Sequence, residues 1–160
     1  MATENKNLSH YNVDQVPNGS DLKIGLVVSE WNPEITENLF KGALDALLDC
    51  GVEKRNILRW NVPGSFELPF GCKKMILTKD MDAIVAIGSV IRGETSHFDY
   101  VCSATSQGIM ELNIQTEVPV IFCVLTDDTI EQSRDRSGGK HGNKGTEAAI
   151  AALKMAVLGK

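Results

Sequence analysis

The segment from residue 88 to residue 99 contains groups that could bind an anion and transfer a proton. Gly93, Glu94 and Thr95 form a short polar turn, and His97 follows two positions later. Unpaired backbone N–H groups at a helix N-terminus favour an anion, and the charge of histidine changes near neutral pH. The spacing predicts an anion site beside a titratable side chain, which is the beginning of an active site. An ordinary glycine turn before a capped helix would explain the turn equally well.

The elements around this segment would place it at the end of a buried strand. Residues 83–87 are apolar and rich in branched side chains, which is typical of a strand buried on both faces, and Gly88 is expected to end it. From Ser96 to Leu112 the apolar residues follow helical spacing. The strand therefore delivers the loop to a helix N-terminus.

Strand and helix patterns alternate four times along the chain. Strands are expected at 23–28, 56–62, 83–87 and 119–125. Asn32 and Ser65 are expected to cap the first two helices, and the third helical segment begins at Ser96. Asp127 and Asp128 are expected to cap a short helix, and residues 137–142 to link it to the last helix. This alternation predicts an α/β fold, a three-layer αβα sandwich of the flavodoxin-like kind around a four-stranded parallel sheet. Residues 21–160 would form this single domain.

Residues 1–20 are polar and lack the apolar core of a secretory signal. We expect a flexible N-terminal arm, with two alternatives open: it adds an edge strand to a neighbouring chain, or it is simply disordered.

Composition argues against several classes of protein. The net charge of −5 and a pI near 5.2 argue against binding nucleic acid or an anionic membrane. No apolar run reaches the roughly 18 residues that a transmembrane helix needs. The cysteines and histidines lack the spacing of a zinc site, so no metal is expected. Reduced, buried thiols in a cytoplasmic protein are expected at the four cysteine positions, Cys50, Cys72, Cys102 and Cys123.

In parallel α/β sheets, ligands bind outside the carboxyl ends of the strands. Four loops would meet there, at residues 29–32, 62–67, 89–97 and 126–128, and they contain most of the polar and aromatic candidates. Three motifs in and after these loops resemble the lumazine synthase family, which forms 6,7-dimethyl-8-ribityllumazine in the penultimate step of riboflavin biosynthesis. The motifs are Val62–Pro69, Gly88–Asp99 and Glu131–Gly145, and the resemblance covers about residues 22–158.

The resemblance implies a reaction. It condenses 5-amino-6-ribitylamino-2,4(1H,3H)-pyrimidinedione with 3,4-dihydroxy-2-butanone 4-phosphate, and it releases phosphate and water. The reaction needs proton transfers and an anion site, but no metal and no redox cofactor.

The resemblance also implies a role for each motif position. His97 would transfer protons, and Trp31, where the family usually has Phe, would stack on the pyrimidine ring. Phe122 and Lys144 would reach the pocket of an adjacent subunit. Phosphate would be bound by Gly93, Glu94, Thr95 and Arg136. The ribityl chain and heterocycle would be bound by Asn32, Ser65, Phe66, Glu67, Ser89, Val90 and Ile91.

Each assignment has a simpler structural alternative. His97 could be a structural residue at a helix start, and Arg136 a solvated arginine at a helix end. Asn32 could be only an N-cap, and Glu67 only an acidic residue favoured by the helix dipole. Glu94 beside an anion requires that its side chain turn to solvent. The remaining alternatives are a helix-entry staple for Trp31, strand core for Phe122 and a surface charge for Lys144.

For the assembly, the resemblance implies homopentamers. The short link after Arg136 favours twelve pentamers in a 60-subunit shell, and it leaves open a riboflavin synthase inside. Two other functions compete with the enzyme: a flavodoxin-like carrier of flavin or lumazine, and a shell-forming structural protein. A carrier of a flavin ring needs no histidine beside its phosphate, which favours the enzyme.

Overall fold

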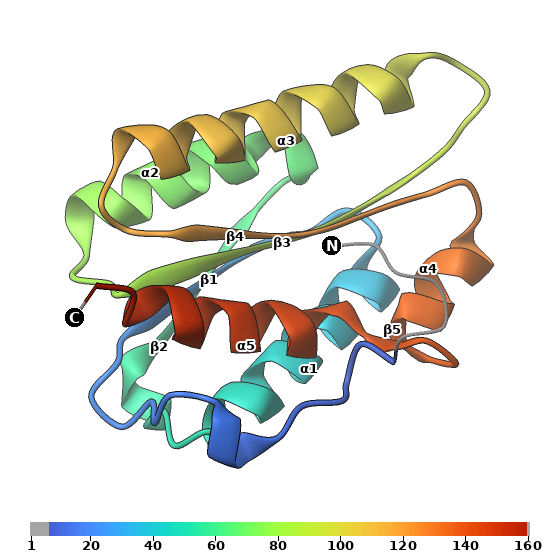
Figure 1. Ribbon diagram of the computed structural model, residues 1–160. Coiled ribbons are helices and arrows are strands. Elements are labelled where there is room, and N and C mark those ends of the chain that lie inside the picture. The colour runs from blue at the N-terminus through green and yellow to red at the C-terminus, as the bar shows by residue number, and fades with distance from the viewer. Residues whose placement is uncertain (1–6, 160) are drawn as a thin grey trace.

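The computed structural model describes residues 7–159, and it confirms the predicted α/β class. Four strands form one parallel sheet in the order β2-β1-β3-β4. The strands are β1 (Ile24–Ser29), β2 (Ile57–Val62), β3 (Ala83–Ile91) and β4 (Val120–Asp127). Helices α2 (Leu68–Thr78) and α3 (His97–Gln115) cover one face. The opposite face carries α1 (Pro33–Asp49), α4 (Ile130–Arg136) and α5 (Lys144–Ala156), so the molecule has three layers (Figure 1).

The sheet divides the core into two parts, because successive strand residues point to opposite faces. Ile24, Leu26 and Val28 of β1 pack on the α1 and α5 side with Leu39, Leu47 and Leu153. Val27 of β1 packs on the α2 and α3 side with Leu68 and Met75. Burial on both faces explains why the strands appear in the sequence as continuous apolar runs.

Strand β3 is longer than the sequence indicates, and the predicted end at Gly88 is wrong. Gly88 pairs with Val124, and the strand continues through Val90 to Ile91. A side chain has no room at this position, because a Cβ on Gly88 would lie 2.5 Å from Ser65 Oγ. The glycine here allows close packing inside a strand.

Three predicted caps are also wrong. Asn32 has the left-handed backbone conformation (φ 57°), and its side chain caps nothing. Ser65 makes no capping bond either and begins a 3-10 helix, Ser65–Glu67, before α2. The α4 helix is capped by Thr129, whose hydroxyl accepts a hydrogen bond from the backbone N–H of Gln132. Asp127 and Asp128 instead use their side chains for other contacts.

The predicted link at 137–142 contains a small antiparallel hairpin of β5 (Ser137–Gly139) and β6 (Gly142–Asn143). Gly142 has a φ of 83°, which glycine adopts without strain. The described part of the N-terminal arm, residues 7–20, lies against this hairpin and α1. The N–H of Leu8 donates to the carbonyl of His141, and Tyr11 Oη donates to Asp49 Oδ2 at 2.7 Å. The flexibility of the arm stays a prediction, and residues 1–6 lie outside the described residues.

Within residues 7–159, none of the helices combines the length and apolar composition needed to span a membrane. In the same range, no group of three His, Cys, Asp or Glu side chains is arranged to hold a metal ion.

Candidate active site

A cavity of about 620 Å³ lies at the carboxyl ends of β1, β2 and β3. The strand order places it where the chain crosses from β1 outward to β2 and then back to β3, the switch point at which ligands bind in open α/β sheets. Ten of the predicted site residues line it: Trp31, Ser65, Phe66, Glu67, Ser89, Val90, Ile91, Gly93, Thr95 and His97. Loops far apart in the sequence therefore contribute to a single cavity.

One end of the cavity offers aromatic surface. Trp31 is 71% exposed and Phe66 is 60% exposed, although both are large apolar side chains. Such exposure in a concave site marks surface available to a ligand or a partner. The arrangement suits a flat heterocycle, with the indole of Trp31 as a stacking surface.

Asn32, which follows Trp31, does not line the cavity. Its Nδ2 donates to the carbonyl of Ser89 at 3.0 Å, so the side chain joins the loop after β1 to the main chain of β3. From the sequence, Asn32 had two possible roles: it could cap the helix, or it could bind the ribityl chain. Its side chain makes no capping bond and instead binds the backbone beneath the site.

The next part of the cavity wall contains buried hydroxyl groups. Ser65 and Ser89 are buried, and within the described chain neither side-chain oxygen has a hydrogen-bond partner. A buried hydroxyl without a partner is unfavourable, so each is suited to a hydrogen bond with a ligand or an ordered water. The main chain of Ser65 is fixed from below, because Thr105 Oγ1 donates to its carbonyl at 3.1 Å.

The other end of the cavity contains the predicted anion loop. Gly93, Thr95 and His97 line the cavity, and His97 is the first residue of α3. The N–H of His97 lies 3.4 Å from Thr95 Oγ1, and the side chain of His97 is exposed. Glu94 is exposed and does not line the cavity. Its negative charge therefore points away from the predicted anion site, as the binding of an anion there requires.

Three lining residues were missed from the sequence: Gly64 in the loop after β2, and Phe98 and Val101 of α3. Helical spacing assigned Phe98 and Val101 to the core, and Phe98 is indeed buried while Val101 is half-buried. The signal that could have found Val101 is its position one helical turn after His97, which places both on one side of α3.

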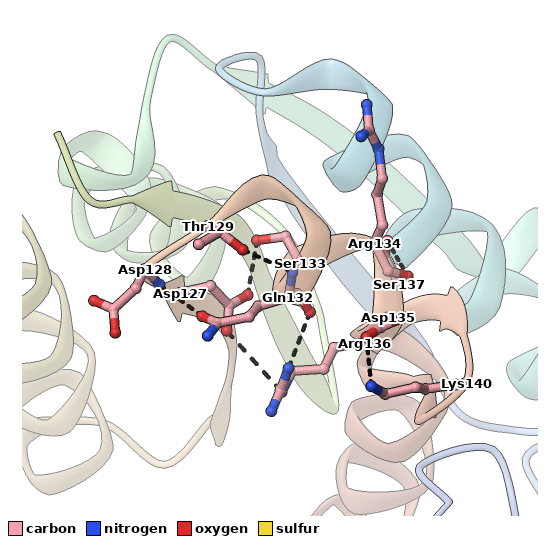
Figure 2. A network of polar contacts seen from close by, with 10 residues as sticks. All are labelled: Asp127, Asp128, Thr129, Gln132, Ser133, Arg134, Asp135, Arg136, Ser137 and Lys140. Carbon is pink, nitrogen blue, oxygen red and sulfur yellow. Dashed lines mark hydrogen bonds and ion pairs between the residues drawn. The ribbon is translucent and has the colours of Figure 1, made fainter.

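Arg136, Phe122 and Lys144 lie elsewhere, around β4 at the edge of the sheet. Arg136 ends α4, and its Nη1 donates to the carbonyl of Gln132 at 3.0 Å while its Nε lies 4.0 Å from Asp127 Oδ1 (Figure 2). Phe122 is 36% exposed on β4, and Lys144 begins α5, where it pairs with Glu147 at 2.9 Å. None of the three lines the cavity of its own chain.

The cysteines offer no reactive thiol to the cavity. Burial raises the pKa of Cys72 and of Cys123 to about 12, and it also raises the pKa of Cys50. Cys102 is only half-buried, contrary to the expectation for all four cysteines, and desolvation with the nearby Asp99 raises its pKa. Raised pKa values leave little thiolate, which is the nucleophilic form.

A larger hollow of about 810 Å³ lies between α1 and the β5–β6 hairpin, away from this chemistry. No predicted site residue lines it, and its two cationic side chains are already paired, Lys41 with Asp45 and Arg134 with Glu34. The smaller cavity is therefore the better candidate for the active site.

The fold and the cavity define a class of protein: an α/β protein with a flavodoxin-like sheet and a cavity at the carboxyl ends of its strands. The family model described as 6,7-dimethyl-8-ribityllumazine synthase matches residues 21–160. The chain belongs to this family.

Three relatives with that name support the assignment. The protein from Christiangramia forsetii is 67% identical, covering 100% of this chain and 96% of its own length. The protein from Flavobacterium johnsoniae is 63% identical, and the match covers 99% of this chain and 83% of that protein's length. The protein from Parabacteroides distasonis is 54% identical, covering 97% of both.

Proposed function

We propose that the cavity holds the two substrates of the lumazine synthase reaction at its two ends. The chain condenses 5-amino-6-ribitylamino-2,4(1H,3H)-pyrimidinedione with 3,4-dihydroxy-2-butanone 4-phosphate, a step of riboflavin biosynthesis. One observation carries the division of the site: a single cavity joins an exposed aromatic surface, Trp31 and Phe66, to a glycine loop at a helix N-terminus that contains His97.

At the aromatic end, Trp31 stacks on the pyrimidine ring, and Phe66 borders it. The ribityl hydroxyls bond to the segment of Ser65 and Glu67, where the unpartnered hydroxyl of Ser65 is available. The heterocycle edge meets the main chain of β3 at Ser89, Val90 and Ile91. The side chain of Asn32 supports this main chain through its bond to the Ser89 carbonyl. A contact of Asn32 with the ribityl chain stays a prediction.

At the other end, the phosphate binds the backbone N–H groups of Gly93, Glu94 and Thr95 with the hydroxyl of Thr95. An N–H cluster at the start of a helix favours a dianion by charge and by hydrogen bonding. His97 lies beside this site and accepts or donates the protons of imine formation, phosphate elimination and ring closure. Histidine is the residue type suited to both roles, because an imidazole can act as a general acid or as a general base near neutral pH.

A second copy of the chain completes the site. Arg136, Phe122 and Lys144 gather around β4 at one edge of the sheet, while the cavity opens at the ends of the other three strands. A head-to-tail contact would bring this edge to the cavity of the next copy and would generate a ring. Arg136 suits phosphate, since its only contacts in the described chain involve Asp127 and the Gln132 carbonyl, which leaves Nη2 free for the anion.

The ring is a homopentamer, as the family resemblance implies, and the short hairpin after Arg136 favours twelve pentamers in a 60-subunit shell. A riboflavin synthase is a candidate partner inside such a shell. The buried, unpaired thiols of Cys50, Cys72 and Cys123 favour a reducing, cytoplasmic location.

Mixing the purified protein with the two substrates tests the function against its alternatives. An enzyme produces the absorption of the lumazine together with one phosphate per product, faster than the uncatalysed mixture. A carrier would bind the lumazine without accelerating its formation. A purely structural shell would do neither, and either result would contradict the proposal.

A further inference from the structure

We propose that Arg92 is a positioning residue, which holds the loop of residues 93–97 in the shape that binds phosphate. The proposal deepens the function proposed above and rests on it. The resemblance gave Arg92 no role, and its side chain does not line the cavity. Its contacts nevertheless enclose the whole anion loop.

The guanidinium of Arg92 joins the end of β3 to α3 and to the loop after β4. Its Nη2 donates to Asp99 Oδ1 at 3.0 Å, and Nη1 lies 3.4 Å from Asp99 Oδ2, which makes a two-point pair with α3. Its Nε donates to Asp128 Oδ1 at 2.8 Å, in the loop after β4. The guanidinium also stacks over the ring of Phe98, 4.1 Å from the ring centroid. The backbone N–H of Arg92 donates to the carbonyl of Asp127 at 3.0 Å.

These contacts lie at both ends of the anion loop. Arg92 immediately precedes Gly93, while Phe98 and Asp99 immediately follow His97. One side chain therefore holds the entry and the exit of the loop together. Phe98 itself lines the cavity, so the stacked guanidinium also sets the wall beside His97.

The loop has little packing of its own to maintain its shape. A Cβ added at Gly93 would meet no atom within 4 Å, and residues 92–97 are all exposed. The one side-chain contact within the loop in the described structure is the 3.4 Å approach of the His97 N–H to Thr95 Oγ1. The positions of the loop N–H groups consequently depend on how its ends are held.

The geometry requires arginine and not only a positive charge. An exposed ion pair stabilises a fold little, but a planar guanidinium with a two-point partner and an aromatic ring fixes direction as well as distance. Lysine keeps the charge and loses the two-point pair. Arg92→Lys therefore separates positioning from the general attraction between a cation and phosphate.

The chain offers a matched control in Arg59 on β2. Arg59 makes the same pair of contacts, a two-point pair with Glu37 on α1 and a stack over Phe40, 4.2 Å from the ring centroid. It lies outside the cavity and outside the proposed machinery. Arg59→Lys thus removes an equivalent cluster at a site that has no anion loop.

The test is the dissociation constant of inorganic phosphate, measured by titration calorimetry in phosphate-free buffer, together with the KM of each substrate. For Arg92→Lys we expect phosphate affinity to fall about five- to tenfold, the size of coupling common for residues in one network. The KM of the butanone phosphate should rise by a similar factor, and that of the pyrimidine should change less than about twofold. Arg59→Lys should alter none of the three.

The variant Asp99→Asn separates the positioning role from simple charge attraction, because the two explanations predict opposite changes in phosphate affinity. Asp99→Asn removes a negative charge near the anion loop, so simple electrostatics predicts tighter phosphate binding. Loss of the Arg92 partner predicts weaker binding. Tighter or unchanged binding in Asp99→Asn would overturn the proposal, as would equal changes for Arg92→Lys and Arg59→Lys.

The calorimetric measurement of phosphate binding does not depend on turnover. A wild-type protein that bound phosphate but formed no lumazine would remove the proposed function, while the variants would still test Arg92. A wild-type protein that bound no phosphate would overturn the positioning role.

Discussion

The buried pair of Asp127 and Ser133 should stabilise the fold much more than it affects catalysis. Asp127 ends β4 and is buried, and its Oδ2 accepts a hydrogen bond from Ser133 Oγ at 2.7 Å (Figure 2). Ser133 is 0% exposed. In Asp127→Ala this hydroxyl loses its partner inside the protein, which costs about 1–3 kcal/mol. A shift of the hydroxyl to the carbonyl of Thr129, one turn earlier, sets the lower end of this range.

Asp127→Ala should have a smaller effect on the phosphate-binding role of Arg136 than on the stability of the fold. Its Nε lies 4.0 Å from Asp127 Oδ1, beyond hydrogen-bond distance, and its side chain is 38% exposed. Solvent-screened pairs of this kind contribute about 0.2–1 kcal/mol. Arg136 also keeps its bond to the Gln132 carbonyl. The KM of the butanone phosphate should therefore rise less than about fivefold in Asp127→Ala, against ~10–150-fold for the loss of a charge-assisted pair in Arg136→Ala.

Denaturant titration and turnover of four proteins would check this reasoning: wild type, Asp127→Ala, Ser133→Ala and the double variant. A loss of about 2 kcal/mol corresponds to roughly 4–8 °C in apparent Tm for a chain of this length. The double variant should be more stable than the sum of the single losses predicts, because it leaves neither group unpartnered, with a coupling of about 1–2 kcal/mol. Additive losses, or a KM effect as large as that of Arg136→Ala, would refute the assignment.

Three further predictions concern the site and the core. His97→Ala should slow turnover by ~10²-fold, the lower end of general acid–base effects, and leave pyrimidine affinity within a few-fold; wild-type kinetics would make His97 a structural residue. Riboflavin or a lumazine analogue should quench the fluorescence of Trp31 much more than that of Trp60, which is half-buried on β2. Trp31→Phe should then remove most of the quenching, and unchanged quenching would count against the stacking. At pH 8, iodoacetamide should label Cys102 well before Cys72 and Cys123, whose pKa of about 12 leaves almost no thiolate below that pH; mass spectrometry showing equal labelling would contradict their burial.

Sequence periodicity was sufficient for the parallel sheet, because burial on both faces produces apolar runs that are easily recognised. It failed where a single contact between distant residues decides the local structure. Gly88 indicates a strand end until the position of Ser65 shows that no side chain fits there. Asp127 is a good capping residue by type, but Ser133 and Arg92 use its side chain and its carbonyl, and the cap falls to Thr129.

In the candidate site, too, the sequence predicted what the fold fixes and missed what depends on contacts between distant residues. The loops after parallel strands could be brought together from the sequence, since the fold fixes where strand ends meet. The motifs also indicated Arg136, Phe122 and Lys144, but the single chain places them outside its own cavity. Arg92 lies inside the motif Gly88–Asp99, but the motif assigned it no role, since its contacts with Asp99 and Asp128 depend on the fold.

Subunit complementation tests most directly the claim that two chains form one active site. Arg136→Ala keeps His97 in its own cavity, and His97→Ala keeps the Arg136 that it supplies to a neighbour. After unfolding and random co-assembly at equal amounts, a ring of head-to-tail contacts should contain about one quarter complete sites, and activity should rise well above the mean of the two parents. Activity that remained at the mean of the parents would show that each chain works with its own Arg136, and it would contradict the shared site.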